Sequence, residues 1–456
     1  PNTRVCPICL GLPGSLPILN EKVVELAVMV GMGLNCRINQ NSSFDRKNYF
    51  YPDLPKGYQI TQYFFPLAQN GWVEVDNDNE QKKIRINRLH LEEDTAKMVH
   101  AGQASLLDFN RGGIPLMEIV TEPDFSSGEE AVIFLKKLRD LVRWVGASRA
   151  RMQHGEMRCD ANVSLWKNGE QLGEVVEVKN INSLRNVREA IDFEFVRQKK
   201  AILAGEKVVK ETRGWNVITM ETVSQRSKEK AHDYRYFPEP DLPGLQLAEE
   251  WIESVRRSLP VLPEAIKNRM MEEYGLDNKK AEVFLDNIEY FYFLEKVYSE
   301  LVVWLKQKNV ELVEEKNLGN KLAGYVLTDF KPLKEEKEIA WEKMSLTPEN
   351  YAELVAMFLA KEINNQSMKK ILAEMLICTD SPLEIAQKNG WLNKDNKIDL
   401  VAIVQTVVEE NTKQVEDYRQ GKEQLMSYFL GQVMKKTNGV ADPKEARELL
   451  VKKLSV

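Results

Sequence analysis

Up to about residue 250, apolar residues recur mostly at every second position, in short stretches separated by glycine and proline. In residues 157–166, Ala161 and Val163 fall on one face and Asp160 and Asn162 fall on the other. This alternation is typical of a strand that is buried on one side. The same pattern predicts further strands at residues 82–94, 113–124 and 173–183.

Helical segments interrupt these strands. Asn20, Ser127 and Ser183 each precede a segment with helical apolar spacing, and residues of these types cap helix N-termini. Gly205 ends the helix that follows Ser183. Strands and helices mixed in this way predict an α+β fold with a mainly antiparallel sheet.

Beyond Pro260 the apolar spacing becomes helical, with Thr347 at one predicted helix start. The polar loop at 388–399 precedes a last helical block. We therefore expect three domains, an α+β domain at 1–255, an all-α domain at 256–395 and a small helical tail at 396–456.

The charge balance does not favour a general attraction to nucleic acid. The chain has 63 Lys and Arg against 69 Asp and Glu, a formal charge of −6, so a nucleic acid would have to meet a local basic surface. Five scattered cysteines indicate a reducing compartment without a disulfide framework. No signal peptide is apparent, and no run of about 18 apolar residues predicts a membrane span. We expect a cytoplasmic protein with no membrane partner.

Carboxylates gather on the polar faces of the predicted strands. Glu118 is flanked by apolar residues, and a carboxylate buried there needs a cation or a donor. His90 and Glu92 share one strand face, whereas strand parity places Glu93 on the opposite face. Such residues around one cavity would suit Mg²⁺ and phosphate. The alternative is an ordinary solvated strand face, and it applies equally to Asp94, Asp160, Asn162, Glu177 and Lys179.

Residues 46–63 (RKNYFYPDLPKGYQITQY) are dense in aromatic, proline and basic residues. They form either a surface loop packed by its own tyrosines or a binding loop with stacking faces and phosphate donors. The chain has no Walker-type G-x-x-x-x-G-K-[ST] loop, so any use of ATP requires an unusual site. Composition alone favours a solvated helix face for Lys435 and Lys436.

Cys6 and Cys9, followed by Gly11, have the spacing of a zinc knuckle. A structural zinc needs four ligands, and these thiolates supply two. Cys36, Cys159 and Cys378 do not form a second pair.

Several long motifs together resemble the GatB family, the B subunits of the aspartyl/glutamyl-tRNA amidotransferases. The motifs are FDRKNYFYPDLPKGYQI, RLHLEEDTAK, NRGGIPLMEIVTEPD, RCDANVS, EVKNINS and DYRYFPEPDLP, and the last helices resemble the YqeY-like tail of that family.

The resemblance implies a cradle-shaped catalytic domain at 1–255 and a YqeY-like tRNA-binding tail at 396–456. It implies an enzyme that uses ATP and Mg²⁺ to phosphorylate the side-chain carboxylate of misacylated Glu-tRNA(Gln) or Asp-tRNA(Asn). Ammonia from a glutaminase subunit then displaces the phosphate. The implied partners are this glutaminase subunit, a small subunit that links the two, the misacylated tRNA and the non-discriminating synthetase.

The resemblance also implies roles for individual residues. The expected Mg²⁺ and phosphate ligands are Glu93, Glu118 and Asp160, with His90, Glu92 and Asn162 beside them. Lys179 is expected to contact phosphate or the ammonia path, and Arg235 to contact phosphate or the tRNA end. The residues expected to contact tRNA are Lys47, Tyr49, Tyr51, Lys56, Tyr58, Lys435 and Lys436.

One departure from the family pattern concerns the metal sites. Family members begin with a strand resembling G-L-E-[IV]-H-V, whose Glu and His help to form the metal site, and the chain starts downstream of it. Some members also carry a C-x-C pair upstream of the knuckle, which with Cys6 and Cys9 would complete a structural zinc site. Two alternatives stay open, a zinc-stabilised RNA-binding protein and a non-catalytic tRNA-binding scaffold subunit.

Overall fold

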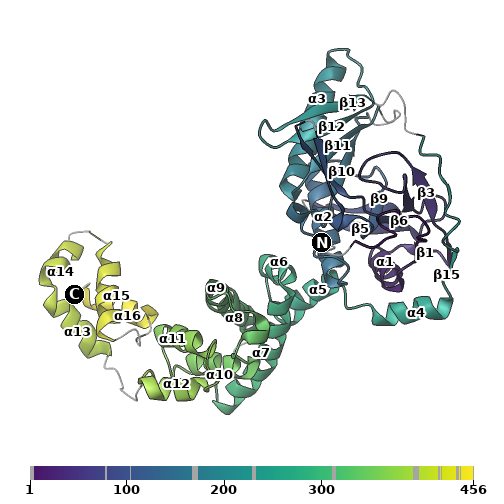
Figure 1. Cartoon of the computed structure of the whole chain (residues 1–456). Coiled ribbons are helices and arrows are strands. Elements are labelled where there is room, and N and C mark those ends of the chain that lie inside the picture. The colour runs from purple at the N-terminus through teal and green to yellow at the C-terminus, as the bar shows by residue number, and fades with distance from the viewer. Residues whose placement is uncertain are drawn as a thin grey trace. The chain divides into compact units, whose positions relative to one another are not determined.

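The computed structural model describes residues 5–77, 80–102, 104–166, 173–227, 233–310, 315–393, 400–419, 422, 424–437, 441 and 443–454. The chain divides into two compact units, one up to Ala265 and one from Ile266 onward. Figure 1 colours the first unit from purple to teal and the second from green to yellow.

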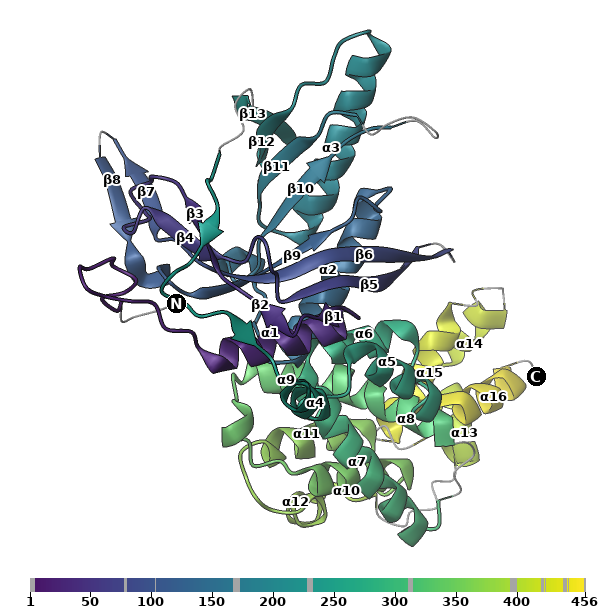
Figure 2. The same cartoon turned by 90° about the vertical axis from the view of Figure 1, so that its right-hand side faces the viewer.

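A four-stranded antiparallel sheet carries most of the candidate residues. Its strand order is β1 (Arg37–Ile38), β5 (Ala68–Asn77), β6 (Glu80–Glu93) and β9 (Pro115–Thr121). Helices α1 (Glu21–Gly33) and α2 (Gly128–Trp144) contact β5, and Figure 2 shows α1 below the long strands β5 and β6.

Strand β6 contains a bulge, which lets apolar residues of odd and even number face the same core. Ile84 and Ile86 differ in parity from Leu89 and Leu91, yet all four side chains lie in one core. The register against β9 shifts before Arg88 because one extra residue is inserted there. The bulge therefore brings both apolar pairs to the same face.

A second sheet contains β10 (Cys159–Val163), β11 (Val176–Ile181), β12 (Glu211–Asn216) and β13 (Glu221–Ser227) in that order. Strands β11 and β12 are parallel, and the other two pairs are antiparallel. Helix α3 (Leu184–Leu203) connects the parallel pair and contacts β10, β11 and β13.

Short strands complete the first unit. A three-stranded sheet has the order β14 (Phe237–Pro238), β3 (Asp45–Asn48) and β4 (Tyr58–Thr61). The remaining elements are the pair β2 (Asn41–Ser42) and β15 (Leu245–Gln246), the hairpin β7 (Lys97–Ala101) and β8 (Ala104–Asp108), the 3₁₀ turns η1 (Phe109–Arg111) and η2 (Met152–His154), and α4 (Glu249–Ser258).

The predicted caps and fold class are confirmed. Asn20, Ser127, Ser183 and Thr347 each accept a hydrogen bond from a backbone N–H in the first turn of the helix that follows. Gly205 has a φ of +79° just beyond α3. The first unit is an α+β structure with mainly antiparallel sheets, and the second is helical in the part that the structure describes.

The described residues of the second unit form helices and short helical turns, and they include the segments for which helical spacing was predicted. These helices and turns are α5 (Pro263–Glu273), which begins just before the boundary, α6 (Asn278–Asp286), α7 (Ile288–Gln307), α8 (Glu315–Tyr325), the π-helical turn η3 (Val326–Phe330), α9 (Lys331–Glu336), η4 (Trp341–Lys343), α10 (Pro348–Leu359), α11 (Asn365–Met375), α12 (Pro382–Asn389), α13 (Leu400–Glu410), α14 (Thr412–Arg419), α15 (Leu425–Lys436) and α16 (Pro443–Leu454).

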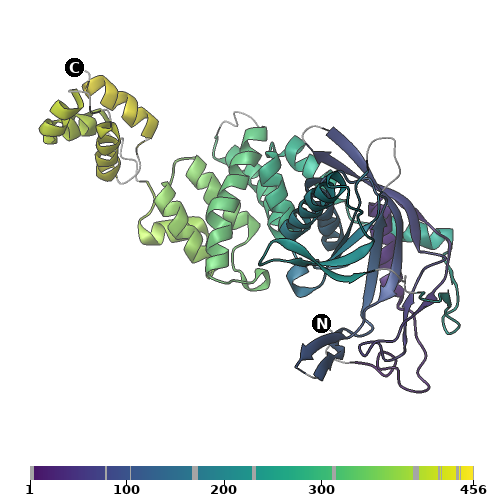
Figure 3. The ribbon, with the colours of Figure 1, turned by 90° about the horizontal axis from the view of Figure 1, so that it is seen from above.

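The last four helices share a core of their own, which includes Val404, Phe429, Val433 and Leu450. Figure 3 shows these yellow helices packed as one small bundle. The predicted boundary at 395/396 lies outside the described residues, and the other predicted boundary at 255/256 lies ten residues before the unit boundary. Among the described helices, none combines the length and apolar character needed to cross a membrane.

Candidate active site

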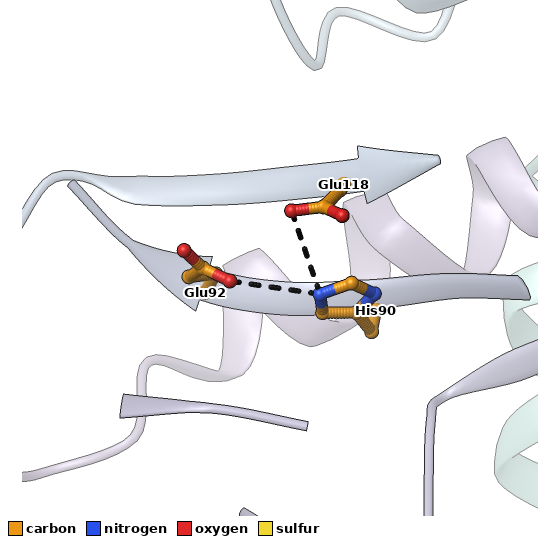
Figure 4. A group of neighbouring side chains, drawn as sticks. All are labelled: His90, Glu92 and Glu118. Atoms are coloured by element: carbon orange, nitrogen blue, oxygen red, sulfur yellow. Dashed lines mark ion pairs between the residues drawn. The ribbon is translucent and has the colours of Figure 1, made fainter. Parts of the chain in front are cut away.

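His90, Glu92 and Glu118 converge on the face of the first sheet that lies opposite its core. His90 and Glu118 are direct cross-strand neighbours on β6 and β9, and Glu92 follows on the same face of β6. His90 Nε2 lies 3.6 Å from Glu92 Oε2 and 3.8 Å from Glu118 Oε2, as Figure 4 shows. Within the described ranges, this is the one group of histidine, cysteine and acidic side chains that could converge on a metal ion.

The three side chains differ in burial, and burial decides which of them an incoming ligand can reach. His90 is 4% exposed and Glu92 is nearly as buried, whereas half of the Glu118 side chain is exposed. His90 Nδ1 is buried and has no hydrogen-bond partner among the described atoms. The group is therefore anchored by His90 and Glu92 and open to an incoming ligand at Glu118.

Glu92 is kept ionised by its neighbours. Burial favours a higher pKa, but a hydrogen bond with His90, the charge of Lys47 and a hydrogen bond from Thr61 together lower the pKa of Glu92 below its ordinary value. Lys47 Nζ on β3 lies 3.6 Å from Glu92 Oε1, and Thr61 Oγ1 on β4 donates to Glu92 Oε2 over 3.0 Å. Lys47, for which a tRNA contact was predicted, thus lies beside this cluster.

Glu93 points away from this cluster, as strand parity predicted. It forms an ion pair with Lys56 and accepts a hydrogen bond from the backbone N–H of Ile60 over 2.9 Å. Its neighbour Glu92 faces the opposite side of β6. The structure therefore does not bring Glu93 together with Glu118. The residue of β6 that lies beside Glu118 and His90 is Glu92.

Asp160 and Lys179 form a separate polar group on the second sheet. Lys179 Nζ lies 3.3 Å from Asp160 Oδ2 and 3.3 Å from Glu177 Oε1. Burial favours a lower pKa for Lys179, but the two carboxylates outweigh it and raise that pKa. Asn162 is exposed on the same strand, in register with Glu177. Asp160 is thus paired with a lysine and is not part of the group around His90, so the predicted trio does not converge.

Asp94 joins the ends of the two larger sheets. It is buried and accepts from Arg111 Nε over 3.1 Å and from Arg158 Nη2 over 2.6 Å. Arg158 immediately precedes β10, and Asp94 immediately follows β6. The guanidinium of Arg111 also donates to the carbonyls of His154 and Gly155. Asp94 therefore has a structural role, and it fixes the first sheet against the start of β10.

Tyrosines border the carboxylate cluster, and the sequence did not single out three of them. Tyr63 and Tyr236 stack with ring centroids 4.0 Å apart and ring planes 7° apart. Tyr234 packs edge-on against Tyr236 and lies 5.2 Å from Lys47 Nζ. Burial raises the pKa of Tyr236, and the charge of Glu92 raises it further. In the motif DYRYF, Tyr234 and Tyr236 stand two positions apart. This spacing is the signal that could have identified them.

Arg235 lies between two of these tyrosines. It is exposed and has a φ of +45°, and Asn48 Nδ2 donates to its carbonyl oxygen over 2.8 Å. This hydrogen bond holds the segment against β3.

The predicted binding loop is partly a packed structure and partly open. Tyr49 donates from its hydroxyl to Gln59 and is half-buried, and the Tyr58 ring lies 4.2 Å from the Arg46 guanidinium. Tyr51 and Phe50 are instead exposed. The loop is therefore packed in part by its own tyrosines, and its exposed rings leave the predicted binding role open.

The two cysteines of the knuckle form a pair. Cys6 Sγ donates to Cys9 Sγ over 3.3 Å. Burial, with the hydrogen bond and the charge of Cys6, raises the pKa of Cys9 to about 11. The described residues add no third histidine, cysteine or acidic ligand to this pair, so they fit one half of a zinc site.

The tail lysines lie at the end of α15. Lys436 pairs with Glu410 over 2.8 Å and is partly exposed, and Lys435 occupies the preceding position. This arrangement agrees with a solvated helix end and leaves Lys435 open to an anionic partner.

The donor set of the carboxylate cluster fits a divalent cation. Two carboxylates and one imidazole nitrogen lie within 4.8 Å of one another, and hard cations such as Mg²⁺ favour carboxylate oxygens with water in the remaining positions. An imidazole ligand is more common with transition metals. The cluster therefore fits Mg²⁺ through Glu92 and Glu118 more directly than through His90.

Two family models match the chain, a GatB/GatE catalytic domain at residues 1–253 and a GatB domain at residues 308–454. Two proteins named as the B subunit of aspartyl/glutamyl-tRNA(Asn/Gln) amidotransferase, from Thermotoga maritima and Thermodesulfovibrio yellowstonii, are each 42% identical to it. These alignments cover 100% and 99% of this chain, and 92% of each relative. The relative of the same name from Persephonella marina is 41% identical, over 99% of this chain and 92% of its own length. The resemblance seen in the motifs is confirmed, and the chain belongs to the GatB family, the B subunits of the tRNA-dependent amidotransferases.

Proposed function

We propose that this chain activates the side-chain carboxylate of misacylated Glu-tRNA(Gln), Asp-tRNA(Asn) or both by ATP-dependent phosphorylation. Ammonia released from glutamine by the glutaminase subunit then replaces the phosphate and gives the correct amide. The observation that carries the proposal is the convergence of His90, Glu92 and Glu118 on one open face of the first sheet. A carboxylate is a poor electrophile and an acyl phosphate is a good one, so activation must precede attack by ammonia.

The residues of the cluster would act by positioning and by charge. Glu92 and Glu118, with His90 beside them, would hold Mg²⁺, which when bound neutralises phosphate charge. Lys47 stands next to Glu92 and would attract the anionic phosphates toward the cluster. Lys179, whose raised pKa keeps it charged, would offer a second cation from the second sheet.

Other residues would support binding. Arg235, an exposed residue, would meet phosphate or the tRNA end. Cys6 and Cys9 would hold a structural zinc as half of its ligand set. Lys435 and Lys436 would contact the tRNA backbone. The partners would be the glutaminase and linking subunits, with the non-discriminating synthetase supplying the misacylated tRNA in the cytoplasm.

An amidation assay tests this function. The chain is combined with its glutaminase and linking subunits, glutamine and ATP, and each misacylated tRNA is supplied separately. We expect Gln-tRNA(Gln), Asn-tRNA(Asn) or both to form only when the chain is present. Amidation without the chain would contradict the proposal.

The same assay separates catalysis from scaffolding. A scaffold subunit would tolerate Glu118→Gln with full ATP-dependent activation of the carboxylate, because this change does not remove a surface that binds tRNA. A catalytic subunit would lose activation while tRNA binding persists.

A further inference from the structure

A pair of stacked tyrosines beside the carboxylate cluster has no part in the chemistry described so far. Tyr63 and Tyr236 lie nearly parallel, with centroids 4.0 Å apart. Tyr63 is still 49% exposed, and the next two residues, Phe64 and Phe65, are 50% and 59% exposed. Three successive aromatic side chains each expose about half of their surface and together form an apolar patch. Contiguous patches of this kind often mark a binding site.

The backbone beneath this patch is held in place. The N–H groups of Tyr63 and Phe64 both donate to Asp45 Oδ2, over 2.7 Å and 3.0 Å. Asp45 is fully buried, so the turn that presents these rings is fixed from within. A fixed ring can bind a planar group without the entropic cost of ordering a loop.

The stacked pair also lies close to the proposed chemistry. Thr61, two residues before Tyr63, donates to Glu92. On the other side, the Tyr236 ring is near enough for the charges of Glu92 and Glu118 to raise its pKa, beside the larger effect of burial. The strand that leads into the Tyr63 turn is thus tied to Glu92 through Thr61.

We propose that the exposed ring of Tyr63, supported by Tyr236, is a stacking site for an adenine base. The inference rests on the proposed function, because both of its substrates present adenosine. ATP is one source, and the terminal adenosine of tRNA, whose ribose carries the amino acid, is the other. Aromatic rings bind bases through their faces without needing a base-specific hydrogen bond.

The test uses the assembled complex with the glutaminase and linking subunits, together with the fluorescent adenine analogue 2-aminopurine, whose emission is quenched when it stacks. One arm places the analogue at the 3′ end of the tRNA, and the other supplies it as a ribonucleoside triphosphate. We expect quenching in the wild-type complex in the arm whose adenine uses the site. Tyr63→Leu, which keeps an apolar side chain but no ring, should abolish that quenching and weaken binding by about 5- to 150-fold.

Two further variants make the result decisive. Tyr63→Phe keeps the ring and should retain the quenching. Phe195→Leu changes a ring on α3 that is 46% exposed and should leave both arms unchanged, which controls for the loss of any exposed ring. Thermal unfolding of each variant establishes that it is folded.

Quenching that depends on Tyr63 in the tRNA arm assigns the terminal adenosine to this site, and in the nucleotide arm it assigns ATP. Quenching and affinity that are the same in Tyr63→Leu and wild type in both arms would overturn the proposal. A failure of the proposed function would look different, because base stacking would depend on Tyr63 while no phosphoryl transfer occurred.

Discussion

At the scale of single residues, Glu92 shows how a buried carboxylate can stay charged. Burial opposes ionisation, and His90, Lys47 and Thr61 more than offset it. Removing one of these partners would leave a costly buried charge. The site is thus stable as a charged group before any ligand arrives.

The lowered pKa of Glu92 predicts an effect of acid on stability. Because the folded state favours the ionised form, this contribution is fully present above the ordinary carboxyl pKa, near 4.5, and is lost as the pH falls through the lower folded value. Glu92→Gln removes the titrating group. Urea unfolding between about pH 6 and pH 3 should show a smaller loss of unfolding free energy in the variant than in wild type. Equal losses in the two proteins would contradict a lowered pKa for Glu92.

Gly113 couples the knuckle to the strand that carries Glu118. It has a φ of +75°, and a Cβ added there would lie 2.1 Å from Cys9 Sγ. Gly113→Ala should therefore lower the free energy of unfolding by roughly 2–3 kcal/mol, through backbone strain and displacement of Cys9.

Gly102 provides the matched control for this change. Its φ is +61°, and nothing lies within 4 Å of an added Cβ, so Gly102→Ala should cost about 1 kcal/mol from the backbone alone. Chemical denaturation measures both values, and a thiol reagent should react faster with Cys9 only in Gly113→Ala. An equal loss of unfolding free energy in the two variants would show that displacing Cys9 adds nothing to the backbone strain.

At the scale of elements, the strand β6 shows what could be predicted from the sequence. Alternation placed His90 and Glu92 on one face and Glu93 on the other, and the structure confirms this parity. The bulge before Arg88 could be suspected, because the apolar residues on its two sides differ in parity. The pairing of β6 with β9 brings Glu118 opposite His90, and no local pattern specifies that partner.

The contacts that could not be predicted from the sequence share one physical cause. Asp160 and Glu118 lie on different sheets, and Lys47 reaches Glu92 from β3. Which side chains meet across sheets depends on how the sheets pack, and periodicity within one segment carries no information about that. The caps of α1, α2 and α3 could be predicted, because each depends on a side chain and the first turn that follows it.

The contact of Asp94 with two arginines predicts a large cost for a small change. Asp94→Asn keeps the shape but removes the charge that Arg111 and Arg158 share, and we expect the unfolding free energy to fall by about 2–4 kcal/mol. Glu253→Gln, which breaks an exposed pair with Arg256, should cost about 0–1 kcal/mol. Similar urea midpoints for the two variants would show that Asp94 does not clamp the sheets.

At the scale of the whole molecule, each unit carries its own core. The carboxylate cluster belongs to the first unit, and the tail helices of the second unit pack around residues of their own. The proposed catalytic cluster and the proposed tRNA-binding tail can therefore be changed separately.

This separation predicts the effect of the tail lysines. The double change Lys435→Ala and Lys436→Ala should weaken tRNA binding and reduce the slope of log Kd against log salt by about 2. The pair Lys452 and Lys453, exposed on α16 of the same tail, is the matched control and should change the slope less. An equal effect of both double variants would indicate general attraction to the tail and not a contact at the end of α15.

The central claim is that the cluster of His90, Glu92 and Glu118 carries the activation of the carboxylate. Its most direct test is the single-turnover transfer of labelled γ-phosphate from ATP to misacylated tRNA in the complex with the glutaminase and linking subunits. Glu118→Gln should slow this transfer by about 100-fold or more while tRNA binding is unchanged. Glu74→Gln, at a carboxylate of β5 that is 45% exposed and paired with Lys83, should leave the rate within about 2-fold of wild type. Transfer at the wild-type rate in folded Glu118→Gln would contradict the account.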